Sequence, residues 1–243
     1  MLLVFEAFVI AHIVTGSVGL VAFWVPVIGR KGGDVHRRFG RVFTFTMLAT
    51  GAAAIGISTA TLIAPLATHP HLDDAVFVRG IFGWMMLYLA VLTINLAWYG
   101  WLCITVKRDR AAMRTPVNLG LQVVLTLLSV NCVVQGVLIG QPLMIGISGI
   151  GFATVATNLY HMYRPAPHPF GWLSEHVKAL VGAGISVYTA FFAFGAVRIM
   201  PEIALNPVLW SVPLITGLAI ILYHRRFILK KRAGKKAAPA VAA

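Results

Sequence analysis

Four histidines carry the chemistry that this sequence could perform, and they are His36, His161, His176 and His224. Imidazole with a nearby carboxylate is a ligand set of zinc and iron sites in proteins. Asp34 precedes His36 by two residues, and Glu175 directly precedes His176. The pattern predicts a metal or haem centre, provided that the fold brings these side chains together. The alternative is that these histidines lie at the membrane interface and are hydrogen-bonded to water and lipid headgroups. Zinc and haem b are both open as the bound group.

Three arginines could hold the anionic part of a cofactor. Arg37 and Arg38 directly follow His36, and Arg164 lies just beyond the fifth apolar run. Guanidinium groups bind carboxylates and phosphates through charge-assisted hydrogen bonds. We therefore expect these arginines to bind an anionic group, such as a haem propionate or a lipid phosphate. The alternative is that the basic residues near His36 only fix the topology and contact anionic phospholipids.

The composition shows what kind of protein must position these residues. Of 243 residues, 59% are apolar and only 11% are charged, whereas soluble domains carry about 25% charged residues. A soluble globular enzyme is therefore excluded. The net charge of +13 comes from short clusters between long apolar runs, which also excludes a nucleic-acid-binding protein. Cys103 and Cys132 both lie inside apolar runs, so neither a disulfide framework nor a cysteine-based zinc motif is expected.

Seven apolar runs reach the ~20 residues that a membrane-spanning helix needs. They cover residues 2–29, 42–65, 80–104, 118–139, 141–163, 177–199 and 207–227. The predicted fold is an all-α, seven-helix transmembrane bundle over residues 1–229. We expect the basic tail, residues 230–243, to be disordered.

The basic residues choose an orientation for this bundle. Eighteen of the 20 lysine and arginine residues fall on one side of the seven spans. Short basic loops stay in the cytoplasm, so the N-terminus is expected outside and the C-terminus in the cytoplasm. All four histidines then lie at the cytoplasmic end. Because the fifth and sixth spans are antiparallel neighbours, we expect His161 and His176 to be the core ligands, with His36 or His224 completing the site.

Polar stripes predict which helix faces point inward. Thr154, Asn158 and His161 fall on one face of the fifth span, and lipid cannot satisfy such a stripe. A second stripe in the third span contains Asn95 between Tyr88 and Tyr99.

His12 is expected near mid-membrane in the first span. We predict that it is neutral and hydrogen-bonded inside the bundle, with Asn131 and Gln135 of the fourth span as candidate partners. Outside the membrane, the loop with His69, His71, Asp73 and Asp74 is either solvated or a weak metal site.

Three kinds of function stay open at this stage. The first is a cytoplasm-facing metal or haem centre that supports redox or metal-dependent chemistry, so whether the protein is an enzyme is undecided. The second is a transporter or channel whose path runs past His12, Asn131 and Gln135 to the cytoplasmic histidines. The third is a membrane sensor or assembly factor. Membrane lipids are expected partners, a small-molecule or lipid substrate fits the first function, and an oligomer stays open.

The chain also resembles a known family at several short motifs. These are the first span with His12, the string from His36 to Arg41 (His-Arg-Arg-Phe-Gly-Arg), and His161 and His176 at the ends of their spans. On these motifs it resembles an uncharacterised family of predicted polytopic bacterial membrane proteins, a domain of unknown function. The resemblance implies a bacterial inner-membrane location and carries no activity.

Overall fold

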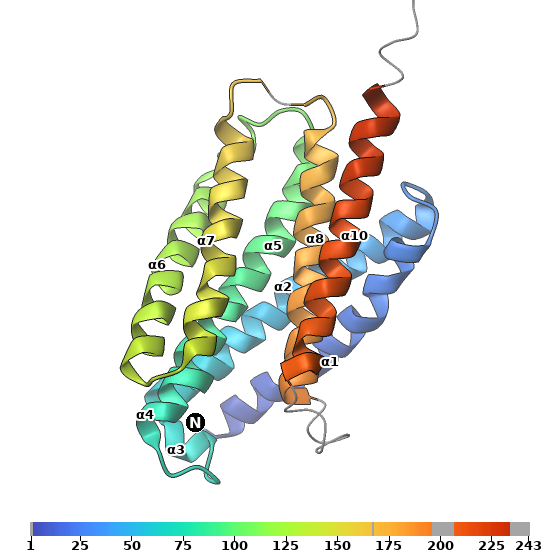
Figure 1. Cartoon of the computed structure of the whole chain (residues 1–243). Helices are drawn as coiled ribbons and strands as arrows, with labels where there is room; N and C mark the ends of the chain where they lie inside the picture. The colour runs from blue at the N-terminus through green and yellow to red at the C-terminus, as the bar shows by residue number, and fades with distance from the viewer. Residues whose placement is uncertain (1, 167, 196–206, 234–243) are drawn as a thin grey trace, which may run out of the picture.

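The computed structural model describes residues 2–166, 168–195 and 207–233, and within these residues the chain is helical without strands (Figure 1). The elements are α1 (Leu2–Ile28), α2 (Asp34–Ile63), α3 (Pro65–Thr68), α4 (Ala75–Val78), the π-helical segment η1 (Arg79–Met85), α5 (Met86–Val106), α6 (Pro116–Leu138), α7 (Pro142–Tyr163), α8 (Gly171–Ala190), the π-helical segment η2 (Phe191–Gly195) and α10 (Pro207–Ala233).

Within the described residues, five helical stretches are long and apolar enough to cross a membrane. They are Leu2–Ile28, Asp34–Ile63, Ala75–Val106, Pro116–Leu138 and Pro142–Tyr163. The expectation of an all-α membrane protein is therefore confirmed. α8 and α10 have 20 and 27 residues, and the count of seven spans stays a prediction.

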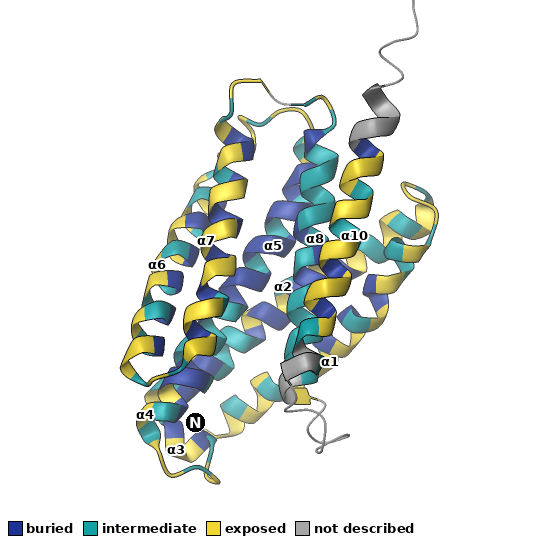
Figure 2. Cartoon of the chain, viewed as in Figure 1, coloured by how far each residue is buried: buried dark blue, intermediate teal, exposed yellow. Residues whose placement is uncertain are grey.

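α5 forms the centre of the bundle. It packs against α2, α6 and α8, while α1 packs along α2 and α10 packs along α8. Figure 2 shows α5 largely buried and the outer faces of α6 and α10 exposed. The exposed residues there are largely apolar, as Leu138 and Ile215 illustrate, which suits a surface in contact with lipid.

The basic loops gather at one end of the bundle, which we call the basic end. Figure 1 shows the α5–α6 and α7–α8 connections there, with the C-terminal end of α10 beside them. Two arginines of the α5–α6 connection hold the last turn of α7. Arg110 Nη1 donates to the carbonyl oxygen of Arg164 at 2.6 Å, and Arg114 Nη2 donates to that of Met162 at 2.7 Å. Cations at a helix C-terminus stabilise its unpaired carbonyls.

Three helices extend further toward the basic end than the apolar runs predict. α2 begins at Asp34 rather than near residue 42, and α8 begins at Gly171 rather than near residue 177. α10 continues to Ala233, beyond the expected boundary at residue 229. Hydropathy detects only the part of a helix that is compatible with lipid. The apolar runs are therefore shorter than helices that continue into the polar interface. His36 and His176 therefore lie on helices, and the tail residues 234–243 lie outside the described residues.

Candidate ligand cavity and buried polar network

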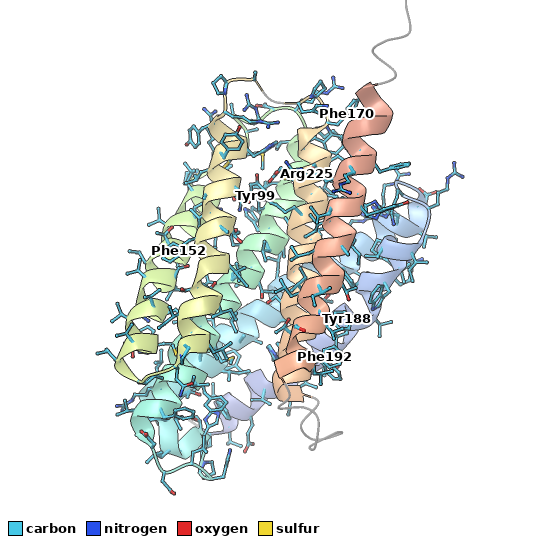
Figure 3. The ribbon with its side chains drawn as sticks, in the orientation of Figure 1. Tyr99, Phe152, Phe170, Tyr188, Phe192 and Arg225 are labelled. Carbon is cyan, nitrogen blue, oxygen red and sulfur yellow. The ribbon has the colours of Figure 1, made fainter. Side chains whose placement is uncertain are left out.

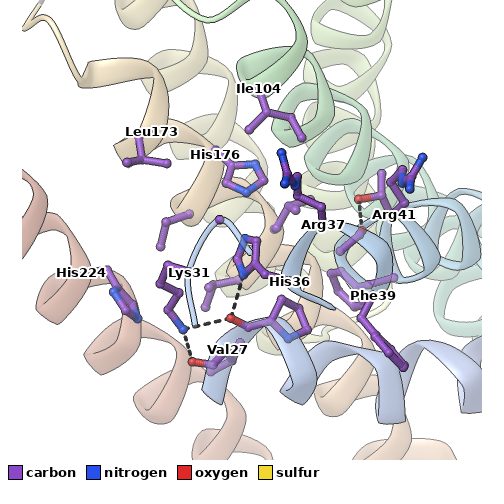
Figure 4. Close-up of a pocket in the computed structure, with 18 of the residues that line it drawn as sticks. Val27, Lys31, His36, Arg37, Phe39, Arg41, Ile104, Leu173, His176 and His224 are labelled. Carbon is purple, nitrogen blue, oxygen red and sulfur yellow. Dashed lines mark hydrogen bonds between the residues drawn. The ribbon is translucent and has the colours of Figure 1, made fainter. Parts of the chain in front are cut away.

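A cavity of about 1700 Å³ opens at the basic end. Its walls come from the last turns of α1, the first turns of α2, the end of α5, the beginning of α8, and α10 (Figure 4). Ordinary ligand pockets have roughly 300–1,000 Å³. The space is therefore large enough for a ligand of porphyrin or lipid size.

Three of the four expected histidines line this cavity: His36 from α2, His176 from α8 and His224 from α10. In Figure 4 the rings of His36 and His176 enter the cavity from opposite sides, and His224 enters from a third. His36 Nδ1 lies 3.1 Å from the carbonyl oxygen of Pro26, and His176 Nδ1 lies 2.9 Å from that of Gly100. A carbonyl oxygen only accepts, so Nδ1 carries the proton in both rings. Nε2 is left as the nitrogen with a lone pair.

The two accepting carbonyls are available for different reasons. Pro26 lies in the last turn of α1, where carbonyls lack helical partners, and Lys31 Nζ also donates to it at 2.9 Å. The partial burial of the Lys31 ammonium group lowers its pKa below the ordinary value. Gly100 lies inside α5, where a Cβ would stand 2.7 Å from Leu180 Cδ2 of α8. The missing side chain lets α8 approach closely enough for His176 to reach the carbonyl.

The charges around the cavity are mostly positive. Its basic residues are Lys31, Arg37, Arg38, Arg41 and Lys107, and its acidic residue is Asp34. Asp34 pairs with Arg37 at 2.8 Å on the exposed side of α2. Much of the remaining wall is aromatic or aliphatic, including Phe23, Trp101, Trp172, Tyr223 and Phe227. A basic rim over an apolar wall suits an amphipathic anion.

His161 and Arg164 do not belong to this cavity, contrary to the expected arrangement. His161 is buried on α7 and its ring lies against Gly171, next to Arg164. The side chain of His176 instead points toward α5, where it contacts Gly100. Successive side chains on a helix point in directions about 100° apart, so the neighbouring Glu175 points to a different side, where it contacts Tyr99. The expected shared centre of His161 and His176 is not formed. Among the described residues, no three histidine, cysteine, aspartate or glutamate side chains stand close enough to hold a metal ion.

A buried polar network lies on the other side of α8, between α5, α6, α7 and α8. Asn158 Nδ2 donates to Asn95 Oδ1 at 3.2 Å and to Gln122 Oε1 at 3.3 Å. Lys178 Nζ donates to Asn158 Oδ1 at 3.2 Å and forms an ion pair with Glu175.

Tyr99 completes this network, because its hydroxyl donates to Glu175 Oε2 at 3.4 Å, and Figure 3 shows Tyr99 in the interior between α7 and α8. The two predicted inward stripes are confirmed, since Thr154, Asn158 and His161 are buried, as are Tyr88, Asn95 and Tyr99. Sequence reasoning missed Gln122 and Lys178. Asn118, Gln122, Leu125 and Ser129 share one face of α6, so the same periodicity could have found Gln122.

His12 is hydrogen-bonded inside the bundle, but to another partner than expected. Its Nδ1 lies 3.1 Å from the carbonyl oxygen of Thr50 on α2. Asn131 and Gln135 lie on α6, which packs against α5 and α7, whereas α1 packs along α2. The expected partners of His12 are therefore wrong. Within the described residues, α2 and α5 separate the helix that carries His12 from the helix that carries Asn131 and Gln135.

Comparisons of the chain with protein-family models, with curated proteins and with solved structures find no match. The resemblance to an uncharacterised bacterial membrane family stays a prediction.

Proposed function

We propose that this integral membrane protein binds haem in the cavity at the basic end, with His36 and His176 as ligands of the iron. The observation that carries the proposal is the pair of Nδ1–carbonyl hydrogen bonds. Histidines that bind metals usually donate their other ring N–H to a carbonyl or carboxylate, which fixes the tautomer and the ring orientation. Both rings have this support and enter one cavity from different helices.

The donor set favours haem over zinc. A zinc site in a protein uses three or four side-chain ligands, and the described residues do not bring three candidates together. Haem iron needs one or two axial protein ligands, because the porphyrin supplies the other four. Two histidines in a large, mostly apolar cavity therefore suit haem, and His224 is a third candidate ligand from α10.

The basic rim supplies partners for the haem propionates. Arg37 is already paired with Asp34, so Arg38 and Arg41 are the better candidates among the arginines of α2. Arg164, which the sequence suggested for this role, lies outside the cavity. A bound haem would supply one-electron redox chemistry. The chain would orient the iron through His36 and His176, bind the propionates, and shield the ring with Phe23, Trp101 and Trp172.

We further propose seven spans, with the basic end in the cytoplasm of a bacterial cell. α8 and α10 serve as the sixth and seventh spans, and the distribution of lysine and arginine supports the orientation. Labelling of single cysteines from outside intact cells tests it. Lys107→Cys should stay unlabelled and Asp73→Cys should react, in a background without Cys103 and Cys132. The reverse labelling pattern would overturn the orientation.

The haem proposal is tested by the absorbance spectrum and haem content of the purified protein, expressed with haem supplied and then titrated with additional haem. The wild type should show a Soret band and about one haem per chain. His36→Ala and His176→Ala should each lose most of the bound haem.

His161→Ala is the matched control, because His161 is a buried histidine at the same end that does not line the cavity. It should keep its haem. A wild type that takes up no haem, or a His176→Ala variant with unchanged content and spectrum, would contradict the proposal. The transporter and sensor hypotheses would then be favoured over the haem proposal.

A further inference from the structure

Lys31 lies in the turn between α1 and α2, and its side chain reaches back to the end of α1. Its Nζ donates to the carbonyl oxygen of Pro26 at 2.9 Å and also to that of Val27. Both carbonyls stand in the last turn of α1, where no further helical N–H follows to bind them. The next residue of the turn, Gly32, has a φ of 78°. Glycine adopts this left-handed conformation readily, and the turn brings the start of α2 back to the end of α1.

The carbonyl oxygen of Pro26 is shared by two donors. Lys31 Nζ lies 2.9 Å from it and His36 Nδ1 lies 3.1 Å from it, and Figure 4 shows both contacts as dashed lines. Two donors that bind one oxygen compete for its electron density, so each hydrogen bond is weaker than it would be alone. Charge-assisted hydrogen bonds are the stronger ones, so the ammonium of Lys31 takes the larger share. The hydrogen bond from His36 is therefore weaker with Lys31 present than without it.

The hydrogen bond at Nδ1 of His36 controls how strongly its Nε2 binds a metal. An Nδ1–H that donates to a carbonyl raises the basicity of the ligand. A more basic ligand stabilises ferric iron more than ferrous iron, because the ferric ion carries one more positive charge. By weakening the hydrogen bond, Lys31 lowers the basicity of Nε2, which favours the ferrous state.

The charge of Lys31 acts in the same direction. Its ammonium acts electrostatically on the rings of His36 and His224. A nearby positive charge disfavours the oxidation state with the larger positive charge, which is the ferric state. Asp34, the acidic residue of the cavity, pairs with Arg37 instead. Both effects of Lys31 therefore favour reduced iron.

We infer that Lys31 raises the reduction potential of a haem bound by His36 and His176, through the shared carbonyl of Pro26 and through its positive charge. The inference rests on the proposed haem site. Lys31 is a positioning residue, because it acts on the iron through His36 and does not bind it. Hydrogen bonds to the axial ligands and charges near the haem are levers by which a protein sets this potential. A lysine that only stabilised the end of α1 would contribute to folding and leave the potential unchanged.

The midpoint potential of the purified haem-bound protein, measured by spectroelectrochemical titration, tests this inference. Lys31→Met removes the charge and both hydrogen bonds of the side chain. The variant should keep its haem, and its one-electron equilibrium should shift about tenfold toward the ferric state, which is a fall of about 59 mV in the potential. Lys31→Arg keeps a charged donor and should recover most of this fall.

Arg30→Met is the matched control, because it removes a positive charge from the same turn at an exposed residue that does not line the cavity. It should keep the wild-type potential. If Lys31→Met binds haem and has the same potential as Arg30→Met, this inference alone is overturned. A fall in the melting temperature of Lys31→Met without a change in potential would assign the lysine to the helix end only. A wild type without haem would overturn the proposed haem site as well, so the two failures are distinguishable.

Discussion

The cavity and the buried polar network lie on opposite sides of α8 and differ in how their polar groups are used. In the network, Asn158, Lys178 and Glu175 bind one another or residues of neighbouring helices. In the cavity, His36 and His176 each use one ring nitrogen for a backbone carbonyl and present the other side of the ring to a large space. Groups that satisfy one another hold helices together, whereas groups with spare bonding capacity around a space can bind a ligand.

The network matters for stability because it joins α7 to the rest of the bundle. Between membrane helices there is little hydrophobic driving force, so packing and interhelical hydrogen bonds carry the association. Lys178 of α8 reaches Thr157 and Asn158 of α7. Asn158 in turn binds side chains of α5 and α6. One amide therefore connects four helices.

The largest expected effect is that of Asn158→Ala on stability. The substitution leaves the Lys178 ammonium without one partner and removes the donor of Asn95 Oδ1 and Gln122 Oε1. We expect a loss of about 2–3 kcal/mol in the free energy of unfolding, because buried groups become unsatisfied. Reversible unfolding in mixed micelles measures it.

Thr44→Ala is the control for this substitution. Thr44 is buried, but its hydroxyl donates only within α2, to the carbonyl oxygen of Gly40 at 2.8 Å. The loss of unfolding free energy in Thr44→Ala should be well below the loss in Asn158→Ala. Equal losses in the two variants would mean that the network does not hold α7 in place.

A smaller effect is expected for Arg38→Gln combined with Arg41→Gln. Neither position belongs to the network, so the free energy of unfolding should change little. One charge-assisted hydrogen bond contributes about 1.5–3 kcal/mol, so the loss of one propionate contact should lower the haem affinity about tenfold or more. Haem titrations at low and high salt measure the affinity. If the variant binds haem as tightly as the wild type, the basic rim does not hold propionates.

The smallest effect is expected at His69, which belongs to neither region. Its ring lies 4.4 Å from that of Phe82, and burial, followed by the charge of His71, lowers its pKa below the ordinary 6.5. The unfolded chain then binds the proton more readily than the folded one. Stability should therefore fall as the pH drops through about 6.5.

The melting temperature measured between pH 5 and pH 8 checks the expectation for His69. The fall should stay below the ~2–4 °C that 1 kcal/mol produces in a chain of this size. His69→Gln should flatten the profile. An unchanged profile in this variant would assign the pH dependence to other histidines.

The sequence predicted the inward faces well, because helical periodicity is a property of one helix at a time. It therefore placed Asn95, Asn158 and His161 correctly in the interior. It paired His161 with His176 wrongly, because that pairing depends on how each helix is rotated against its neighbours. The partners of His12 were wrong for a related reason. Seven apolar runs do not say which spans are adjacent, and two helices, α2 and α5, lie between α1 and α6.

The cavity itself could not be predicted from the apolar runs. It depends on α2 and α8 continuing past the expected membrane boundary, which moves His36 from a loop onto a helix and places His176 in the second turn of α8 instead of at its start. It also depends on the close approach of α8 at Gly100. The sequence shows that a glycine lies in an apolar run, but it does not show which neighbouring helix packs closely against that glycine.

The contacts between α5 and α8 also fix the angle of α8 about its own axis. Tyr99 binds Glu175, and the next residue on each helix forms the next contact, from His176 to Gly100. Further along, Thr93 and Ser186 are hydrogen-bonded at 2.7 Å. If α8 rotated about its axis so that the Tyr99–Glu175 contact became shorter, the His176–Gly100 contact would become longer. The hydrogen bond between Thr93 and Ser186 opposes a tilt of α8 against α5. α8 can therefore rotate only slightly about its axis, and the direction of the His176 imidazole is fixed equally closely.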